Sequence, residues 1–219
     1  MLLFSSTAHA QKYVGGDISM LPAYERAGAT YFTHDGKAIS NVLSFFKEEG
    51  WNAMRVRLFV NPTKQTTEYS NGTYTWSTDN NVCQDIAWVK TLGKRIKDAG
   101  LKFMLDIHYS DTWADPGKQW TPEAWALLSD DALATKVYNY TTDVLTQLKN
   151  AGALPDKVQT GNEISYGMLW GRPNSTLYQC WPSSTANWDR FTKLLSQATK
   201  AVRAITPSAK IILHVERVS

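Results

Sequence analysis

Five short runs of mostly apolar residues recur along the chain, and longer segments with helical periodicity separate them. Short apolar runs bounded by polar residues are typical of strands that a parallel sheet buries on both faces. The runs cover residues 13–18, 53–59, 102–107, 157–160 and 210–215. We therefore predict five strands, most of which end in polar or charged residues.

Four of the intervening segments carry apolar residues three and four positions apart, a spacing that places them on one face of a helix. These stripes run over residues 39–46, 82–96, 133–148 and 188–205. Each of the first three is closed by a glycine, and Pro207 stops the fourth. Because Gly and Pro at these places are typical stop signals, the pattern predicts an alternation of strands and helices.

Two α/β architectures fit this alternation, a (β/α)8 TIM barrel and a doubly wound parallel sheet. The long polar segments 63–80 and 110–120 follow strands, which is where barrels build their sites. No Gly-rich phosphate loop, the signature of doubly wound nucleotide-binding sheets, follows any strand. The barrel is therefore favoured. Successive strands start about 49 residues apart, so eight units need on the order of 400 residues. We expect this chain to cover about the first five units.

Composition narrows the class of ligand. The 219 residues include 23 Lys and Arg against 20 Asp and Glu, a formal charge of +3, with no block of like charges to bind nucleic acid. No apolar run approaches the length of a membrane span. The chain is rich in aromatic residues, with 9 Trp and 10 Tyr, many in polar segments. Flat rings beside polar groups suit sugars, so we expect a saccharide partner and neither nucleic acid nor membrane.

The first ten residues end in Ala8-His9-Ala10, which is typical of a signal-peptide cleavage site. We interpret residues 1–10 as a signal-peptide remnant, with an N-terminal tail as the alternative, and residues 11–219 as the N-terminal part of one catalytic domain. A secreted or periplasmic location follows. Cys83 and Cys180 allow one disulfide or two free thiols, and their spacing does not indicate a zinc site.

The fourth predicted strand leads into Asn162-Glu163, which places a carboxyl group at the mouth of the expected barrel. Glycosidic cleavage needs a carboxylic acid that protonates the leaving oxygen, and retaining enzymes add a carboxylate nucleophile about 5 to 5.5 Å away. Asn162 beside it is suited to bind a sugar hydroxyl. The alternative is a surface pair that caps a helix.

Four longer motifs then occur in order. They cover residues 16–22, 55–62, 106–119 and 161–170, and the third reads Asp-Ile-His-Tyr-Ser-Asp-Thr-Trp-Ala-Asp-Pro-Gly-Lys-Gln. Together they strongly resemble the arabinogalactan endo-beta-1,4-galactanases of glycoside hydrolase family 53. The resemblance covers nearly everything from residue 13 to about residue 214.

The resemblance implies a secreted, retaining endo-hydrolase that cuts β-1,4-galactan in pectin side chains on a (β/α)8 barrel, with no cofactor or catalytic metal. Glu163 matches the family's acid/base, Asn162 the residue expected to hold the sugar 2-hydroxyl, and Arg57 the site arginine. The further candidate substrate-binding residues are His108, Trp113, Trp170 and Asp111. Each has a structural alternative: a buried histidine, a tryptophan that packs a loop, and an aspartate that fixes a loop. We expect a monomer at full length.

The chain also departs from the family. The family's nucleophile is a Glu at the end of the seventh strand, beyond the five units expected here, and Glu216 is a poor match for it. Two alternatives therefore stay open. One is another retaining β-glycanase, and the other is a catalytically inactive, glycan-binding truncated barrel.

Overall fold

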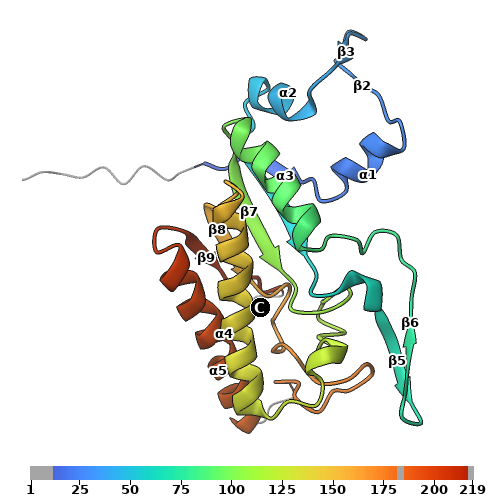
Figure 1. Ribbon diagram of the computed structural model, residues 1–219, viewed down its shortest axis with the longest axis vertical. Coiled ribbons are helices and arrows are strands. Elements are labelled where there is room, and N and C mark those ends of the chain that lie inside the picture. Colours follow the sequence, from blue (N-terminus) through green and yellow to red (C-terminus); the bar gives the residue numbers. More distant parts are fainter. Residues whose placement is uncertain (1–11, 182–184, 217–219) are drawn as a thin grey trace, which may run out of the picture.

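The computed structural model describes residues 12–181 and 185–216. Its centre is a five-stranded parallel sheet with the order β1-β4-β7-β8-β9 (Figure 1). The strands are β1 (Gly15–Asp17), β4 (Ala53–Leu58), β7 (Lys102–Ile107), β8 (Lys157–Thr160) and β9 (Lys210–Ile212). All five predicted strands are confirmed, although β1 and β9 are shorter than predicted. The predicted signal-peptide remnant lies outside the described residues.

The order of the strands decides between the two architectures. Within this sheet, each strand pairs with the sheet strand that comes before it in the sequence, and every pair is parallel. A doubly wound sheet reverses its strand order at a switch point, whereas a barrel keeps neighbours in sequence next to one another. The sheet therefore has the topology of the first five units of a (β/α)8 barrel.

The main helices confirm the four predicted stripes. They are α2 (Val42–Glu48), α3 (Ile86–Asp98), α4 (Asp130–Asn150) and α5 (Thr185–Ile205), and a short helix, α1 (Leu21–Arg26), follows β1. Asn41, Asp85 and Ser129 cap the first three of these stripe helices by accepting backbone N–H groups. The glycines that follow them have positive φ, as helix ends require.

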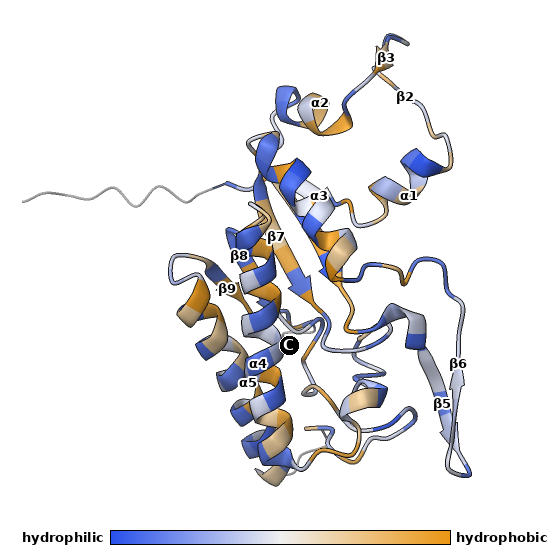
Figure 2. Cartoon of the chain, in the orientation of Figure 1, coloured by the Kyte–Doolittle hydropathy of each residue, from blue (hydrophilic) through white to orange (hydrophobic). Residues whose placement is uncertain are grey.

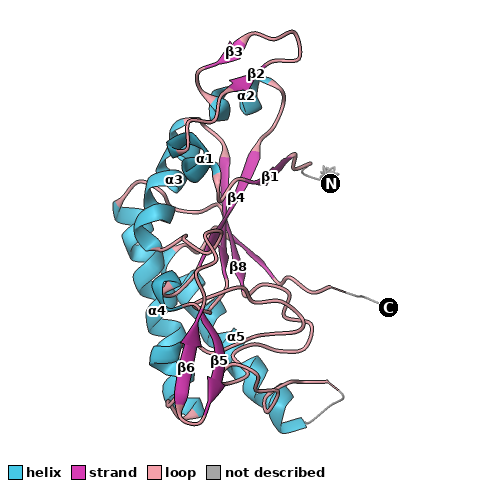
Figure 3. Cartoon of the chain, turned by 90° about the vertical axis from the view of Figure 1, so that its right-hand side faces the viewer, coloured by secondary structure: helices cyan, strands magenta, loops and turns pink. Residues whose placement is uncertain are grey.

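The helices α3, α4 and α5 lie together on one side of the sheet (Figure 3). Against them pack the side chains of the helix face, which we define as Met54, Val56, Leu58, Phe103, Leu105, Ile107 and Val158, all fully buried. Figure 2 shows the apolar residues of β7 in this layer. Alternate residues of the same strands form the polar face, defined as Arg55, Arg57, Lys102, Met104, Asp106, Lys157 and Gln159. Part of this second face borders an open pocket of about 250 Å³.

Two hairpins depart from the prediction. The segment 63–80, predicted to be a loop, contains a 3₁₀ turn (Pro62–Lys64) and an antiparallel pair, β5 (Thr66–Ser70) with β6 (Thr73–Trp76). A smaller pair, β2 (Tyr31–Phe32) with β3 (Ala38–Ile39), joins α1 to α2. The loop predicted at 110–120 is confirmed, with one isolated bridge inside it and a 3₁₀ turn (Glu123–Trp125) after it. Both cysteines are free thiols, so the disulfide alternative is not realised.

Candidate active site

A cleft of about 260 Å³ opens at the carboxyl ends of the strands. Side chains from β4, from the loops after β7 and β8, and from the segment after β9 line it. The lining residues are Arg55, Arg57, His108, Trp113, Ala114, Asp115, Asn162, Glu163 and His214. Five of the seven predicted site residues therefore share one cleft, although their positions span more than 100 residues of sequence.

Arg55 is the centre of the polar network beneath the cleft. Its Nη1 donates to Asp17 Oδ2 at 2.8 Å, and its Nη2 donates to Asn162 Oδ1 at 2.9 Å and also to Asp106. The Asp106 side chain is 0% exposed, and its carboxylate is paired with this arginine and accepts a hydrogen bond from Gln159. The planar guanidinium thus ties β1, β4, β7 and the turn after β8 together.

Asn162 is fixed by the network on both sides of its amide. Oδ1 accepts from Arg55, and Nδ2 donates to the carbonyl of Ala114 at 2.7 Å. The ring of His214 also contacts this oxygen, with its Nδ1 2.8 Å from Asn162 Oδ1. An amide nitrogen carries two hydrogens, so Nδ2 retains one for a sugar hydroxyl. The Asn162 side chain is therefore already oriented before any ligand arrives.

Glu163 sits in a strained turn directly after β8. Its φ is +50°, which is rare for a residue with a side chain, and Gly161 two residues earlier has φ +101°. A Cβ at Gly161 would lie 2.6 Å from Ile164 Cγ2, so no larger residue fits there. Gln119 Nε2 holds the turn by donating to the carbonyls of Asn162 at 2.7 Å and Glu163 at 3.2 Å. The turn places the half-buried Glu163 at the cleft. Its carboxyl group forms no ion pair with another described residue.

His108 is buried in the cleft wall between two fixed partners. Its Nδ1 accepts the backbone N–H of Ala114 at 3.1 Å, so in the neutral ring the proton lies on Nε2. Nε2 lies 3.0 Å from Asp106 Oδ2, close enough for charge attraction but not aligned as a hydrogen bond. These contacts fit the structural alternative for His108 while still placing its ring at the cleft.

Trp113 and Arg57 form a stacked pair at the other side of the cleft. The Arg57 guanidinium carbon lies 4.6 Å from the centroid of the indole ring. Trp113 Nε1 donates to Asp79 Oδ2 at 2.9 Å, and this bond is the main reason why the pKa of Asp79 is lowered. Asp79 follows the β5–β6 hairpin, so the hairpin region helps to orient the indole.

Trp170 and Asp111 lie outside the set of residues that line the cleft. Trp170 is 1% exposed, and its Nε1 donates to the carbonyl of Tyr166 at 3.0 Å. Asp111 accepts the backbone N–H of Asn61 at 3.0 Å on one oxygen and that of Glu123 at 2.9 Å on the other. Burial raises the pKa of Asp111 to about 7. The contacts of both residues fit the loop-packing alternatives.

Four residues of this network, Arg55, Asp106, Gln159 and His214, are not among the predicted site residues. The first three carried a signal, because each is a polar residue inside an apolar strand, on the face opposite the core. Within residues 12–181 and 185–216, no group of three or more His, Cys, Asp or Glu side chains could hold a metal ion. None of the described helices is long and apolar enough to cross a membrane.

One known protein family matches nearly the whole chain. The model of glycosyl hydrolase family 53 matches residues 13–219. The chain belongs to this family. Family 53 therefore accounts for the order of the four motifs, and the sequence resemblance is confirmed.

Individual relatives of the chain support the same family assignment. An arabinogalactan endo-beta-1,4-galactanase of Cellvibrio japonicus is 38% identical over 208 residues, which cover 93% of this chain and 49% of the relative. Its counterpart from Thermothelomyces thermophilus is 37% identical and covers 94% of this chain and 54% of its own length. The Ignisphaera aggregans GH53 catalytic domain superposes with a TM-score of 0.74 at 35% identity, over 92% of this chain and 50% of that domain. The chain thus spans about half the length of these family 53 relatives.

Proposed function

We propose that this chain is the N-terminal part of an endo-hydrolase that cleaves β-1,4-galactosidic linkages in arabinogalactan. The relatives named for this activity in Cellvibrio japonicus and Thermothelomyces thermophilus support the substrate. The observation that carries the proposal is the position of Glu163, a carboxyl without an ion pair among the described residues, at the end of β8 beside a fixed amide.

In the proposed retaining mechanism, Glu163 protonates the leaving oxygen and later takes a proton from the attacking water. The free Nδ2 hydrogen of Asn162 binds the sugar 2-hydroxyl, and the Arg55 network keeps that amide in place. Trp113 offers an aromatic ring for a sugar, with Arg57 stacked against it. His108 supports the wall by holding the loop that carries Ala114.

A retaining mechanism also needs a carboxylate nucleophile. Among the described residues that line the cleft, the carboxylates belong to Glu163 and Asp115. Asp115 Oδ1 accepts the backbone N–H groups of Gly117 at 2.8 Å and Lys118 at 3.1 Å, so it is committed to its own turn. We therefore assign the nucleophile to chain beyond the fifth unit, as the length of the relatives suggests.

The proposal is tested in a chimera that supplies the remaining units of the barrel. The chain is joined after β9 to the C-terminal half of the Cellvibrio japonicus relative, and reducing ends released from galactan, mannan and xylan are measured. We expect cleavage of galactan, reduced about 100-fold or more by Glu163→Gln because the general acid is lost. The exposed Glu49→Gln makes the same chemical change outside the cleft and should leave the rate unchanged. Full activity in the Glu163→Gln chimera would remove Glu163 from this role, and preference for mannan or xylan would overturn the substrate.

For the chain by itself we propose glycan binding without turnover, because the described residues of its cleft supply one uncommitted carboxyl group, that of Glu163. Calorimetric titration with galactotetraose should show binding, while the same sample releases no reducing ends. Release of reducing ends by the chain alone would place both carboxylates within the five units. The cleavage-site pattern Ala8-His9-Ala10 supports export, and we propose galactan in pectin side chains as the natural substrate of the exported protein.

A further inference from the structure

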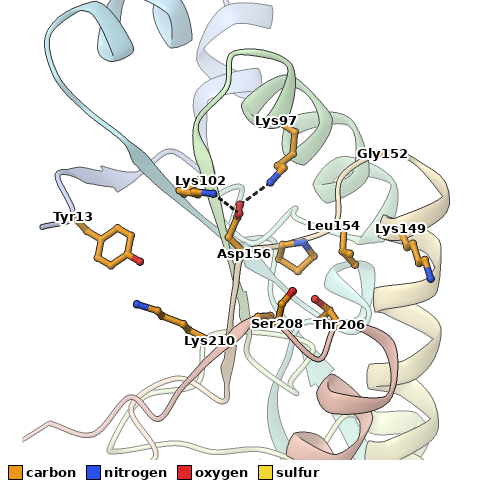
Figure 4. Close-up of a pocket in the computed structure, with 12 residues that line it drawn as sticks. Tyr13, Lys97, Lys102, Lys149, Gly152, Leu154, Asp156, Thr206, Ser208 and Lys210 are labelled. Atoms are coloured by element: carbon orange, nitrogen blue, oxygen red, sulfur yellow. Dashed lines mark hydrogen bonds and ion pairs between the residues drawn. The ribbon is translucent and has the colours of Figure 1, made fainter. Parts of the chain in front are cut away.

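A pocket of about 510 Å³ lies at the amino ends of the strands, at the opposite end of the sheet from the cleft. Four lysines line it: Lys97, Lys102, Lys149 and Lys210. Figure 4 shows Asp156 near its centre, with the hydroxyl groups of Thr206 and Ser208 turned toward it and Tyr13 on the far side. The pocket is therefore strongly basic, although the chain as a whole carries a formal charge of only +3.

Among the described residues that line the pocket, Asp156 is the one carboxylate, and two of the lysines already pair with it. Its Oδ2 accepts from Lys97 Nζ at 2.7 Å and from the backbone N–H of Phe103 at 2.9 Å, and its Oδ1 accepts from Lys102 Nζ at 3.0 Å. Lys149 forms no ion pair with another described residue. The positive charge of the pocket thus exceeds what its own carboxylate can neutralise.

A fifth lysine, Lys157, adds further positive charge next to the pocket. Lys157 on β8 is the register partner of Lys210 on β9, so two ammonium groups leave neighbouring strands on the same face. Lys157 is only 8% exposed, with its Nζ over the ring of Tyr13. Burial, followed by the charge of Lys210, lowers the pKa of Lys157. An anion bound between these strands would relieve their mutual repulsion.

Helix dipoles explain only part of the cluster. Lys97 and Lys149 lie in the last turns of α3 and α4, where positive charge stabilises the exposed carbonyl groups. Lys102, Lys157 and Lys210 instead begin three adjacent strands, and sheets have only small net dipoles. Three lysines therefore have no helix to stabilise.

We propose that this pocket binds an acidic saccharide, whose carboxylate or phosphate groups contact Lys102, Lys149 and Lys210. The volume is far larger than a single inorganic ion requires, and Leu154 and Pro155 add an apolar wall to the hydroxyls of Thr206 and Ser208. Lysine provides point-like positive charge that suits either anionic group, and hydroxyls and apolar edges suit a sugar ring. The site is separate from Glu163 and does not depend on hydrolysis.

The test is calorimetric titration of the chain with three probes: a galacturonate tetramer, galactose 6-phosphate and inorganic phosphate. We expect at least one of the two acidic saccharides to bind. The double substitution Lys149→Gln and Lys210→Gln should weaken that binding at least about tenfold through the loss of charged contacts. The matched control is Lys200→Gln, an exposed lysine on α5 away from the pocket, which should bind like the unmodified chain. Glu163→Gln should also leave this binding unchanged.

A second measurement keeps the proposal testable if the double variant folds poorly by circular dichroism. In the unmodified chain, raising the NaCl concentration should weaken binding of the acidic saccharide, because exposed charges are screened. The proposal is overturned if neither acidic saccharide binds, if inorganic phosphate alone binds, or if binding is insensitive to both salt and the lysine substitutions.

Discussion

The helix face and the polar face of the sheet are built from the same strands, yet they do different work. On β7, Phe103, Leu105 and Ile107 point to the helices and are fully buried. Their immediate neighbours Lys102 and Asp106 point the other way. One side of each strand therefore holds the fold together, and the other side supplies the charged groups.

The polar face is also graded along the strands. At the amino ends, Lys102 and Lys210 line the basic pocket, with Lys157 beside Lys210, and further along the strands Arg55 and Asp106 form the network under the cleft. Met104 lies between the two ends on β7. The polar face therefore shows that a buried charge is tolerated where a neighbouring strand supplies the opposite charge.

The sharpest test of the comparison uses adjacent residues of β7. Leu105→Ala should lower the free energy of unfolding by about 2 to 5 kcal/mol, because it leaves a cavity in the packed helix face. Met104→Ala removes a side chain of similar volume from the half-buried polar face and should cost about 1 kcal/mol or less. Urea unfolding measures both. Equal losses would mean that the two faces contribute alike to stability.

The next effect concerns the buried charge. Asp106→Asn removes the negative charge that faces Arg55 and should cost about 3 kcal/mol of unfolding free energy, because the Asp106 side chain is fully buried and the Arg55 side chain is only 24% exposed. The matched change Asp98→Asn removes the partner of Lys94 in a pair that is exposed on both sides, and should cost under about 0.5 kcal/mol. A small effect of Asp106→Asn in urea unfolding would show that the network orients Asn162 without stabilising the fold.

The smallest expected effect lies in the loops above the sheet. Asp111→Asn places an NH2 group against one of two backbone N–H donors and should cost about 1 to 3 kcal/mol. The substitution should also change the pH dependence. Burial raises the pKa of Asp111 from its ordinary 3.8 to about 7, so the folded chain binds this proton more tightly than the unfolded chain does.

The sign of that dependence follows from proton linkage. The stabilisation from protonated Asp111 is fully present below pH 3.8 and is lost as the pH rises toward 7. Chemical unfolding between pH 4 and pH 7 should therefore show a fall in stability in the unmodified chain that is absent from Asp111→Asn. The same slope in both proteins would assign the pH dependence to other groups.

The sequence predicted the parts of the fold that depend on burial. Continuous apolar runs mark strands such as β7, whose bounds match the prediction, and helical stripes with capping residues mark α3 and α4. These signals are local, because each strand and helix presents its own apolar pattern to a shared core.

The β5–β6 hairpin was missed because most of its residues are exposed and many are polar, so it leaves no regular apolar pattern. A different local signal was nevertheless present. Asn71-Gly72 lies between Thr- and Tyr-rich segments, and both residues have positive φ, as a tight two-residue hairpin turn requires. Turn chemistry could have predicted what periodicity could not.

The candidate site was only partly predictable. Glu163, Asn162 and Trp113 stand in recognisable motifs, whereas the role of Arg55 depends on contacts with residues 38, 51 and 107 positions away. Such contacts follow from strand register, which the sequence does not state. Similarly, Trp170 appears in a motif, yet its position inside the loop packing is set by tertiary structure.

The agreement between sheet order and chain order also has a consequence for how this protein is made. Each new strand docks onto the one completed just before it, so no strand of the sheet must wait for a distant partner to emerge from the ribosome. A growing chain can extend its sheet one unit at a time, with the apolar side of each unit covered as soon as its helix is synthesised. Folding can therefore proceed in the direction of translation, with each newly made strand forming the growing edge of the sheet.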